Sequence, residues 1–305
     1  MIAVAEQVLN GVQFGITLFL MAAGLTLIFG VMNLVNLAHG SLYMVGAYIA
    51  AATFNATHSF LLGIGAALAG TAAVGIAIEV VVFRRLYRRD HLDQVLATFG
   101  LILFFNELVR MIWGATALYA QVPGFLAGQV ELLPGAPYPT YRLAIIVAGL
   151  VVGVLIYLLV MKTRIGMLIR AGASDRTMVG ALGVNITLLY TLVFGVGAAL
   201  AALSGALAGP VFTVESGMGD DLLILAFVVI VIGGIGSIRG AFIASVLVGV
   251  VDTIGRAFLR QLFALVMSGF AADSAGPATA SMLIYVLMAA VLFFRPQGLF
   301  PRENR

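Results

Sequence analysis

The sequence predicts an all-α, polytopic transmembrane helical bundle, on the basis of its composition and the placement of its charges. Of the 305 residues, 62% are hydrophobic and only 10% are charged, whereas a soluble domain carries about 25% charged residues. This deficit extends over the whole length, so too few charges are left to build a soluble surface. The basic residues gather between long apolar segments, as they do in loops that join membrane spans. We therefore expect a single transmembrane domain over residues 1–305.

Nine segments are long and apolar enough to be spans, since a span needs about 20 such residues. Counts of eight or ten remain open alternatives. The junctions at 30–31 and 238–241 are tight, so we expect broken helices there, inside the bilayer. The nine expected spans are 8–30, 31–54, 60–83, 95–113, 142–161, 186–209, 222–238, 241–260 and 279–294.

Three basic clusters orient the bundle through the positive-inside rule. With nine spans and an outside N-terminus, all three clusters and Arg239 fall in the cytoplasm, as does the C-terminus. The loops 114–141, 210–221 and 261–278 then face outside, and none contains Lys or Arg. The clusters are Arg84, Arg85, Arg88 and Arg89; Lys162, Arg164, Arg170 and Arg176; and Arg295, Arg302 and Arg305.

Residues 162–185, KTRIGMLIRAGASDRTMVGALGVN, form a charged loop on the basic side that contains a helix-forming stretch. Ser174 can cap this helix with Asp175 in its first turn, and Gly183 can end it. So short a helix is marginal alone in water, so it needs a partner surface. We expect a cytoplasmic coupling helix on which a soluble motor acts; the alternative is a basic anchor on lipid headgroups. The expected coupling residues are Ala173, Ser174, Asp175, Arg176, Met178, Val179, Ala181, Leu182 and Gly183.

A polar stripe in GVMNLVNLAHGS is the first candidate for a translocation path. Asn33, Asn36 and His39 are three residues apart and would share one face of a helix. Polar side chains at the edge of a lipid-embedded segment are costly unless they face protein or a water-filled path. Gly40 then permits a bend or a break. The alternative is a polar interfacial loop between two spans, and the spacing alone does not choose between them.

The second candidate is the glycine-rich run GGIGSIRG at 233–240, which will not hold a firm helix. Unwound backbone at membrane depth is tolerated where it lines a cavity or is buried in protein. If Arg239 marks the cytoplasmic end, the run is instead a tight turn. We place Gly233, Gly234 and Gly236 opposite the polar stripe, beside the same path.

No pattern of an enzyme is present, so we expect no catalytic residue, metal or cofactor. The chain has no cysteine, no His cluster, no metal-ligand spacing and no Gly-Lys-Ser/Thr of a nucleotide-binding loop. The net charge is only +3, and the basic residues cluster in loops between spans. Membrane topology explains this clustering, so it does not indicate binding to nucleic acid. We interpret Glu79 with Arg84, Glu107 with Arg110 and Asp252 with Arg256 as structural pairs.

Four segments resemble LivH-type permeases, one of the two membrane subunits of branched-chain amino acid ABC importers. They are GLTLIFGVMNLVNLAHGSLYMVGAYIA (24–50), RAGASDRTMVGALGVNITLLYTLVFGVGAALAALSGALAGPV (170–211), AFVVIVIGGIGSIRGAFIASVLVG (226–249) and RPQGLFP (295–301). The resemblance implies a bacterial cytoplasmic (inner) membrane protein that pairs with a LivM-like permease. It further implies two cytoplasmic ATPase subunits, a periplasmic solute-binding protein and an amino-acid substrate.

In that family the cytoplasmic loop docks in a groove of the ATPase, a role that falls here on Ala173 to Gly183. The stretch TMVGAL between Asp175 and Gly183 is more apolar than the family pattern. The family also includes permeases for urea and short amides, which is the alternative cargo. A secondary transporter would need ionisable groups at mid-membrane, whereas the acids here sit near span ends. A membrane-embedded scaffold or enzyme is the third class.

Overall fold

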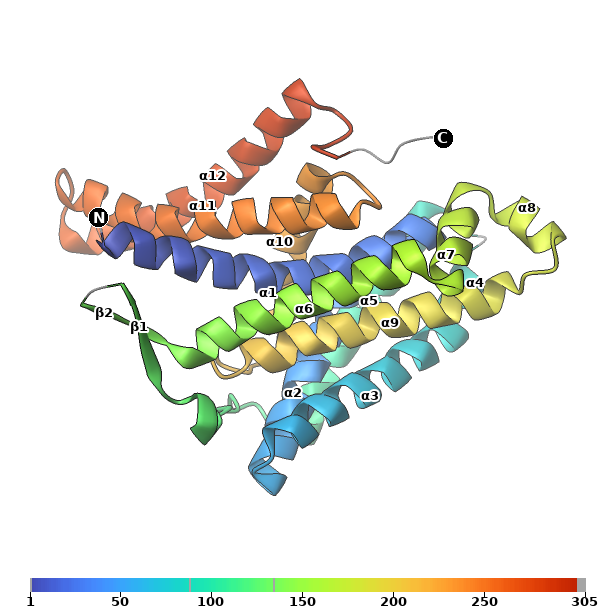
Figure 1. Ribbon diagram of the computed structural model, residues 1–305, viewed down its shortest axis with the longest axis horizontal. Coiled ribbons are helices and arrows are strands. Elements are labelled where there is room, and N and C mark those ends of the chain that lie inside the picture. The colour runs from blue at the N-terminus through green and yellow to red at the C-terminus, as the bar shows by residue number, and fades with distance from the viewer. Residues whose placement is uncertain (1, 88, 134, 301–305) are drawn as a thin grey trace.

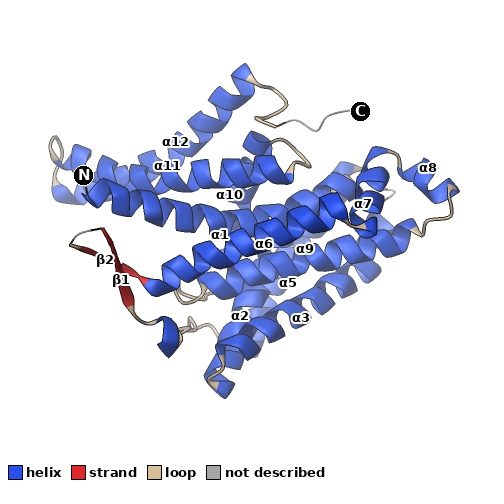
Figure 2. Ribbon diagram, in the orientation of Figure 1, coloured by secondary structure: helices blue, strands red, loops and turns tan. Residues whose placement is uncertain are grey.

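The computed structural model describes residues 2–87, 89–133 and 135–300, and these are almost entirely helical (Figures 1 and 2). Arg88, Pro134, Arg302 and Arg305 lie outside the described residues. The helices are α1 (Ile2–Met32), α2 (His39–Thr57), α3 (Phe60–Ile78), the π-helix η1 (Glu79–Phe83), α4 (Arg84–Leu86), α5 (His91–Trp113), the 3₁₀ turn η2 (Gly124–Leu126), α6 (Thr140–Lys162), α7 (Arg164–Ser174), α8 (Arg176–Ala181), α9 (Ile186–Ala208), α10 (Met218–Gly233), α11 (Ile238–Ala264) and α12 (Gly269–Phe294).

A small hairpin is the only sheet in the described part of the chain. Strands β1 (Gln129–Leu133) and β2 (Ala136–Pro139) pair antiparallel, with Val130 opposite Tyr138. The hairpin lies at one end of the bundle and α8 at the other (Figure 1). We call these the hairpin end and the α8 end.

Helix α1 is the centre of the bundle and contacts α11, α9, α6 and α10. Small residues allow the closest of these approaches. A Cβ added at Gly249 of α11 would lie 2.4 Å from the carbonyl oxygen of Gly11, and one at Gly15 would lie 2.7 Å from that of Ser245. Glycine is therefore needed where α1 crosses α11, as small residues are at close helix crossings in lipid.

Seven helices among the described residues are long and apolar enough to cross a membrane. They are α1, the stretch Phe60–Leu86, α5, α6, α9, α11 and α12. The two other expected spans, 31–54 and 222–238, correspond to α2 with 19 residues and α10 with 16. By length and composition the count is thus seven, not the nine expected. Both shorter helices are largely enclosed by protein, so they need less apolar length than lipid would demand.

Both expected helix breaks are present, each displaced by a few residues. Helix α1 continues to Met32 and ends where Asn33 adopts a φ of +53°. The chain is then non-helical until α2 begins. Helix α10 ends at Gly233, and Ser237 caps α11 by accepting a hydrogen bond from the N–H of Gly240 at 3.1 Å. Between them the backbone turns through Gly234 and Gly236, which both have positive φ.

Helices α2 and α10 begin inside the bundle rather than at its ends. A Cβ added at Gly24 of α1 would lie 3.0 Å from Nε2 of His39, the first residue of α2. A Cβ added at Gly40 would lie 2.4 Å from the carbonyl oxygen of Gly219, and one at Gly219 would lie 2.0 Å from that of Gly40. The N-termini of α2 and α10 therefore meet in direct backbone contact beside α1.

Candidate functional site

The loop 162–185 is an ordered unit of two helices, each begun by its own polar cap. The hydroxyl of Thr163 accepts from the N–H of Gly166 at 3.0 Å and starts α7. The carboxylate of Asp175 accepts from the N–H groups of Thr177 and Met178, both at 2.9 Å, and starts α8. Such caps satisfy N–H groups that the first helical turn leaves without partners.

The prediction that Ser174 caps the coupling helix is wrong by one residue. Ser174 is the last residue of α7, and Asp175 has the extended backbone of a cap, with φ −147° and ψ 96°. The expected end of the helix is confirmed, because Gly183 follows Leu182 with φ +86°. A left-handed glycine is a common way for a helix to stop.

The apolar residues of α8 divide between the protein and the surface. Val179 is buried, whereas Met178 is 59% exposed and Leu182 is 76% exposed. Met178 and Leu182 are four residues apart and therefore lie on one face of the turn. Ala181, Arg176 and Asp175 are exposed as well. Helix α8 thus presents a small apolar face with charged residues at its start.

Helix α7 connects α8 rigidly to the bundle. Arg170 donates a hydrogen bond to the carbonyl oxygen of Val160 at the end of α6. Gly166 packs so closely on that end that an added Cβ would lie 2.2 Å from the carbonyl oxygens of Leu159 and Val160. The same helix also contacts α1 and α9. Helix α7 thus lies between α8 and three long helices, α1, α6 and α9.

A cavity of about 280 Å³ opens at the α8 end between α1, α6, α7 and the turn before α11. Thr26 and Gly30 of α1 line it, together with Ala173 of the expected coupling residues and Gly236 of the expected path residues. Arg239 also lines it and donates to the hydroxyl of Tyr157 at 2.6 Å.

The three residues of the expected polar stripe do not share a helical face, because the segment 33–38 is not helical. Asn33 is exposed. Asn36 and His39 are fully buried, and their side-chain nitrogen and oxygen atoms find no well-formed hydrogen bond among the described residues. Buried polar atoms nearly always have partners, so the Asn36 amide is an exception to the usual pattern, whereas the His39 imidazole lies close to the backbone of Met21. Gly40 packs against Gly219 instead of bordering open space.

Gly233 and Gly234 pack closely against the backbone of neighbouring segments. A Cβ added at Gly240 would lie 2.0 Å from the carbonyl oxygen of Gly233. The C-terminal segment covers the end of α10, where the N–H groups of Leu299 and Phe300 donate to the carbonyl oxygens of Ile232 and Gly233 at 2.8 and 3.1 Å. Of the three glycines expected beside the path, Gly236 lines the cavity at the α8 end, whereas Gly233 and Gly234 do not line it.

A larger cavity, of about 900 Å³, opens at the hairpin end between α1, α10, α11 and the loop that precedes α10. Its wall carries the ion pair of Arg256 with Asp252, whose Nε–Oδ1 distance is 2.8 Å. Arg142, at the start of α6, donates to Oδ1 of Asn10 in the same wall at 2.5 Å. Sequence reasoning missed this cavity because its residues come from distant segments; the only local signal was the spacing of Asp252 and Arg256.

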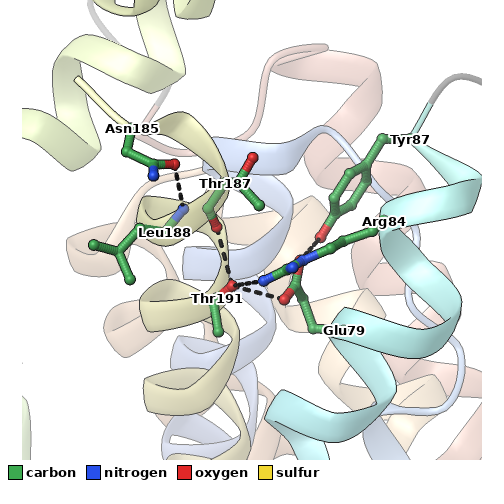
Figure 3. Close-up of polar contacts among 7 residues, drawn as sticks. All are labelled: Glu79, Arg84, Tyr87, Asn185, Thr187, Leu188 and Thr191. Carbon is green, nitrogen blue, oxygen red and sulfur yellow. Dashed lines mark hydrogen bonds and ion pairs between the residues drawn. The ribbon is translucent and has the colours of Figure 1, made fainter. Parts of the chain in front are cut away.

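A buried carboxylate joins α3 to α9 close to the loop 162–185 (Figure 3). Glu79, in η1, is fully buried. Its Oε1 accepts from the hydroxyl of Tyr87 at 2.9 Å and from Nε of Arg84 at 3.4 Å. Its Oε2 accepts from the hydroxyl of Thr191 of α9 at 2.7 Å, and Arg84 also donates to that hydroxyl at 3.0 Å. The predicted Glu79–Arg84 pair is confirmed as part of this larger cluster.

Long apolar helices, a cavity at each end and an ordered surface helix are the features of a multi-pass membrane protein. The family model of the branched-chain amino acid transport system permease component matches residues 7–292, and the chain belongs to that family. No solved structure matches the chain.

The most informative relatives are similar to this chain along nearly their whole length. The high-affinity branched-chain amino acid transport system permease protein BraD of Pseudomonas aeruginosa is 30% identical, over 98% of this chain and 96% of its own. LivH of Escherichia coli, with the same description, is 28% identical over the same shares. A probable branched-chain amino acid transport permease protein LivH of Methanocaldococcus jannaschii is 24% identical, over 96% of this chain and 92% of its own.

Proposed function

We propose that this chain is a permease subunit of an ATP-binding-cassette importer that moves branched-chain amino acids across the cytoplasmic membrane. Membership of the family supports the transport class, and the descriptions of the relatives support the cargo. ATP is bound and hydrolysed on two separate cytoplasmic subunits. A LivM-like permease completes the membrane part as a heterodimer, and a solute-binding protein delivers the amino acid.

The α8 end faces the cytoplasm in this proposal, and the hairpin end faces the binding protein. The first two basic clusters support the orientation. The described members of the first cluster lie between η1 and α5, and those of the second lie in the loop 162–185. Positive charge near span ends favours the cytoplasmic side. The N-terminus of α1 is then outside.

The observation that carries the coupling role is the exposed apolar face of α8, formed by Met178 and Leu182. An exposed apolar pair on a short, firmly capped helix is a suitable knob for a groove in a partner, as in other helix-in-groove contacts. Because α7 adjoins α8 and contacts α1, α6 and α9, a push on α8 reaches the helices that border the cavity at the α8 end.

The amino acid passes, in this proposal, from the cavity at the hairpin end to the one at the α8 end. The N-termini of α2 and α10 separate the two cavities where Gly40 contacts Gly219. Asn36 and His39 lie at this closed point, and the unpaired amide of Asn36 can bind the substrate or water when the contact opens. Gly236 borders the exit.

The test of the coupling role is amino-acid uptake and ATP hydrolysis by the assembled transporter carrying Met178→Glu and Leu182→Glu. Charges placed on the docking face should abolish uptake and its coupling to hydrolysis while insertion stays normal. Met167→Glu is the matched control, because Met167 is 55% exposed on α7 of the same loop. Normal uptake in this double variant and in one with Asp175 and Arg176 reversed in charge would show that α8 is not the coupling helix.

A further inference from the structure

The cavity at the hairpin end has charged groups that the protein leaves without an opposite charge. Arg256 is satisfied within the wall, since it binds both carboxylate oxygens of Asp252 and the hydroxyl of Ser281. Arg142 donates to the neutral Asn10 and also lies close to the hydroxyl of Tyr138, so neither neighbour carries an opposite charge. The acids Glu215 and Asp221 also line the cavity and form no ion pair with the described residues. One cation and two anions are therefore available to a bound molecule.

Tyr43 is an independent sign that a polar molecule binds in this cavity. Its side chain is fully buried and contributes to the cavity wall, yet its hydroxyl has no hydrogen-bond partner among the described residues. A buried tyrosine hydroxyl normally has a partner, because leaving a buried donor unmade costs about 1–3 kcal/mol. The hydroxyl is enclosed within the cavity wall, so a small rearrangement of the Tyr43 side chain would bring it to a molecule bound in the cavity.

Apolar residues form one part of the wall, between polar side chains such as Gln7, Gln13 and Thr213, and this part suits a branched aliphatic side chain. The apolar residues of the wall include Phe14 of α1, Phe212 of the loop before α10, and Leu222 and Leu225 of α10. Binding sites for small molecules typically combine a mainly apolar lining with a few well-placed polar groups. The cavity thus holds opposite charges, a hydroxyl and an apolar surface in one space.

We propose that this cavity is the site where the permease receives a zwitterionic amino acid with an apolar side chain. Arg142 and the hydroxyl of Tyr43 bind its α-carboxylate, Asp221 binds its α-ammonium group, and Leu222 and Leu225 contact the side chain. This assignment rests on the proposed function, from which the class of cargo is taken. It adds the residues of the permease that recognise that cargo. Of these, Tyr43 lies one helical turn after His39, which is at the closed point.

Uptake of radiolabelled leucine by the complete reconstituted transporter tests the assignment. Arg142→Gln, Tyr43→Phe and Asp221→Asn should each lower the maximal uptake rate about tenfold or more, because a hydrogen bond to a charged group is lost. The amount of assembled complex should stay unchanged. Asp273→Asn is the matched control, since Asp273 pairs with Arg260 at the same end but does not line the cavity.

Protection of an introduced thiol is the second test, which does not depend on turnover. The chain has no cysteine, so Leu222→Cys places a single thiol of this subunit in the cavity wall. Leucine should slow its reaction with a maleimide in the assembled complex. Phe270→Cys, at a position 86% exposed at the start of α12 and outside the cavity, should react at the same rate with and without leucine.

The two experiments separate failure of the site from failure of the function. Normal uptake in all three cavity variants, or no protection of Leu222→Cys by leucine, would overturn the site while leaving the permease role intact. If the unaltered complex takes up no leucine, both the proposed function and the site assigned from it are refuted.

Discussion

Replacing Thr191 with valine would remove the contact of α9 with the buried carboxylate of Glu79. The substitution keeps the shape of the side chain but deletes its hydroxyl. Oε1 of Glu79 would keep Tyr87 and Arg84 as donors, whereas Oε2 would lose the donor that lies 2.7 Å away. Arg84 would also lose the acceptor at 3.0 Å. We expect α3 and α9 to be held together less firmly at the α8 end.

The size of the effect follows from what the carboxylate loses. A hydrogen bond to a charged group contributes about 1.5–3 kcal/mol. The lower figure applies, because Thr191 is only half-buried and water can partly replace it. With about 1.4 kcal/mol per factor of ten, the equilibrium between folded and unfolded protein should shift about tenfold towards the unfolded state.

Reversible unfolding in mixed micelles by a denaturing detergent can measure this shift. Trp113 is the only tryptophan, and it stacks on Tyr48 with ring centroids 5.1 Å apart, so its fluorescence reports loss of the fold. Thr187→Val is the control, because Thr187 is exposed one turn earlier on α9 (Figure 3). Equal midpoints for the two variants would refute the role given to Thr191.

Two further predictions concern packing and the path. Gly205→Ala should destabilise the fold in the same assay, because its Cβ would lie 2.1 Å from the carbonyl oxygen of Tyr43; Gly65→Ala, with no atom within 4 Å, should be neutral or stabilising. Asn36→Leu and His39→Leu should slow amino-acid uptake more than they reduce assembly of the complex. A loss of assembly with no separate transport defect would instead mean that Asn36 and His39 serve the fold.

The sequence predicts well those features that depend on neighbouring residues. The helical class follows from composition, and the end of α8 follows from Gly183, whose positive φ is a local preference of glycine. The start of α8 was missed by one residue because Ser174 and Asp175 are both good caps. The choice between them depends on where α7 ends, and α7 is fixed by the packing of Gly166 on α6.

Features that depend on distant residues could not be predicted. Thr191, which completes the Glu79 cluster, lies 112 residues away along the chain. The cavity at the hairpin end likewise unites Tyr43, Arg142 and Asp221 from three separate helices. Periodicity also suggests one helical face for Asn36 and His39, whereas the chain leaves the helix at Asn33, with a φ of +53°, and stays non-helical until α2.

The segment that covers the end of α10 has a consequence for biosynthesis. Residues 295–300 leave the ribosome seconds after α10, at about 5–20 residues per second. Until then the carbonyl groups of Ile232 and Gly233 lack the N–H groups of Leu299 and Phe300. The end of α10 therefore stays uncovered until translation is almost complete, and a stop codon shortly before this segment would leave it uncovered in the truncated permease.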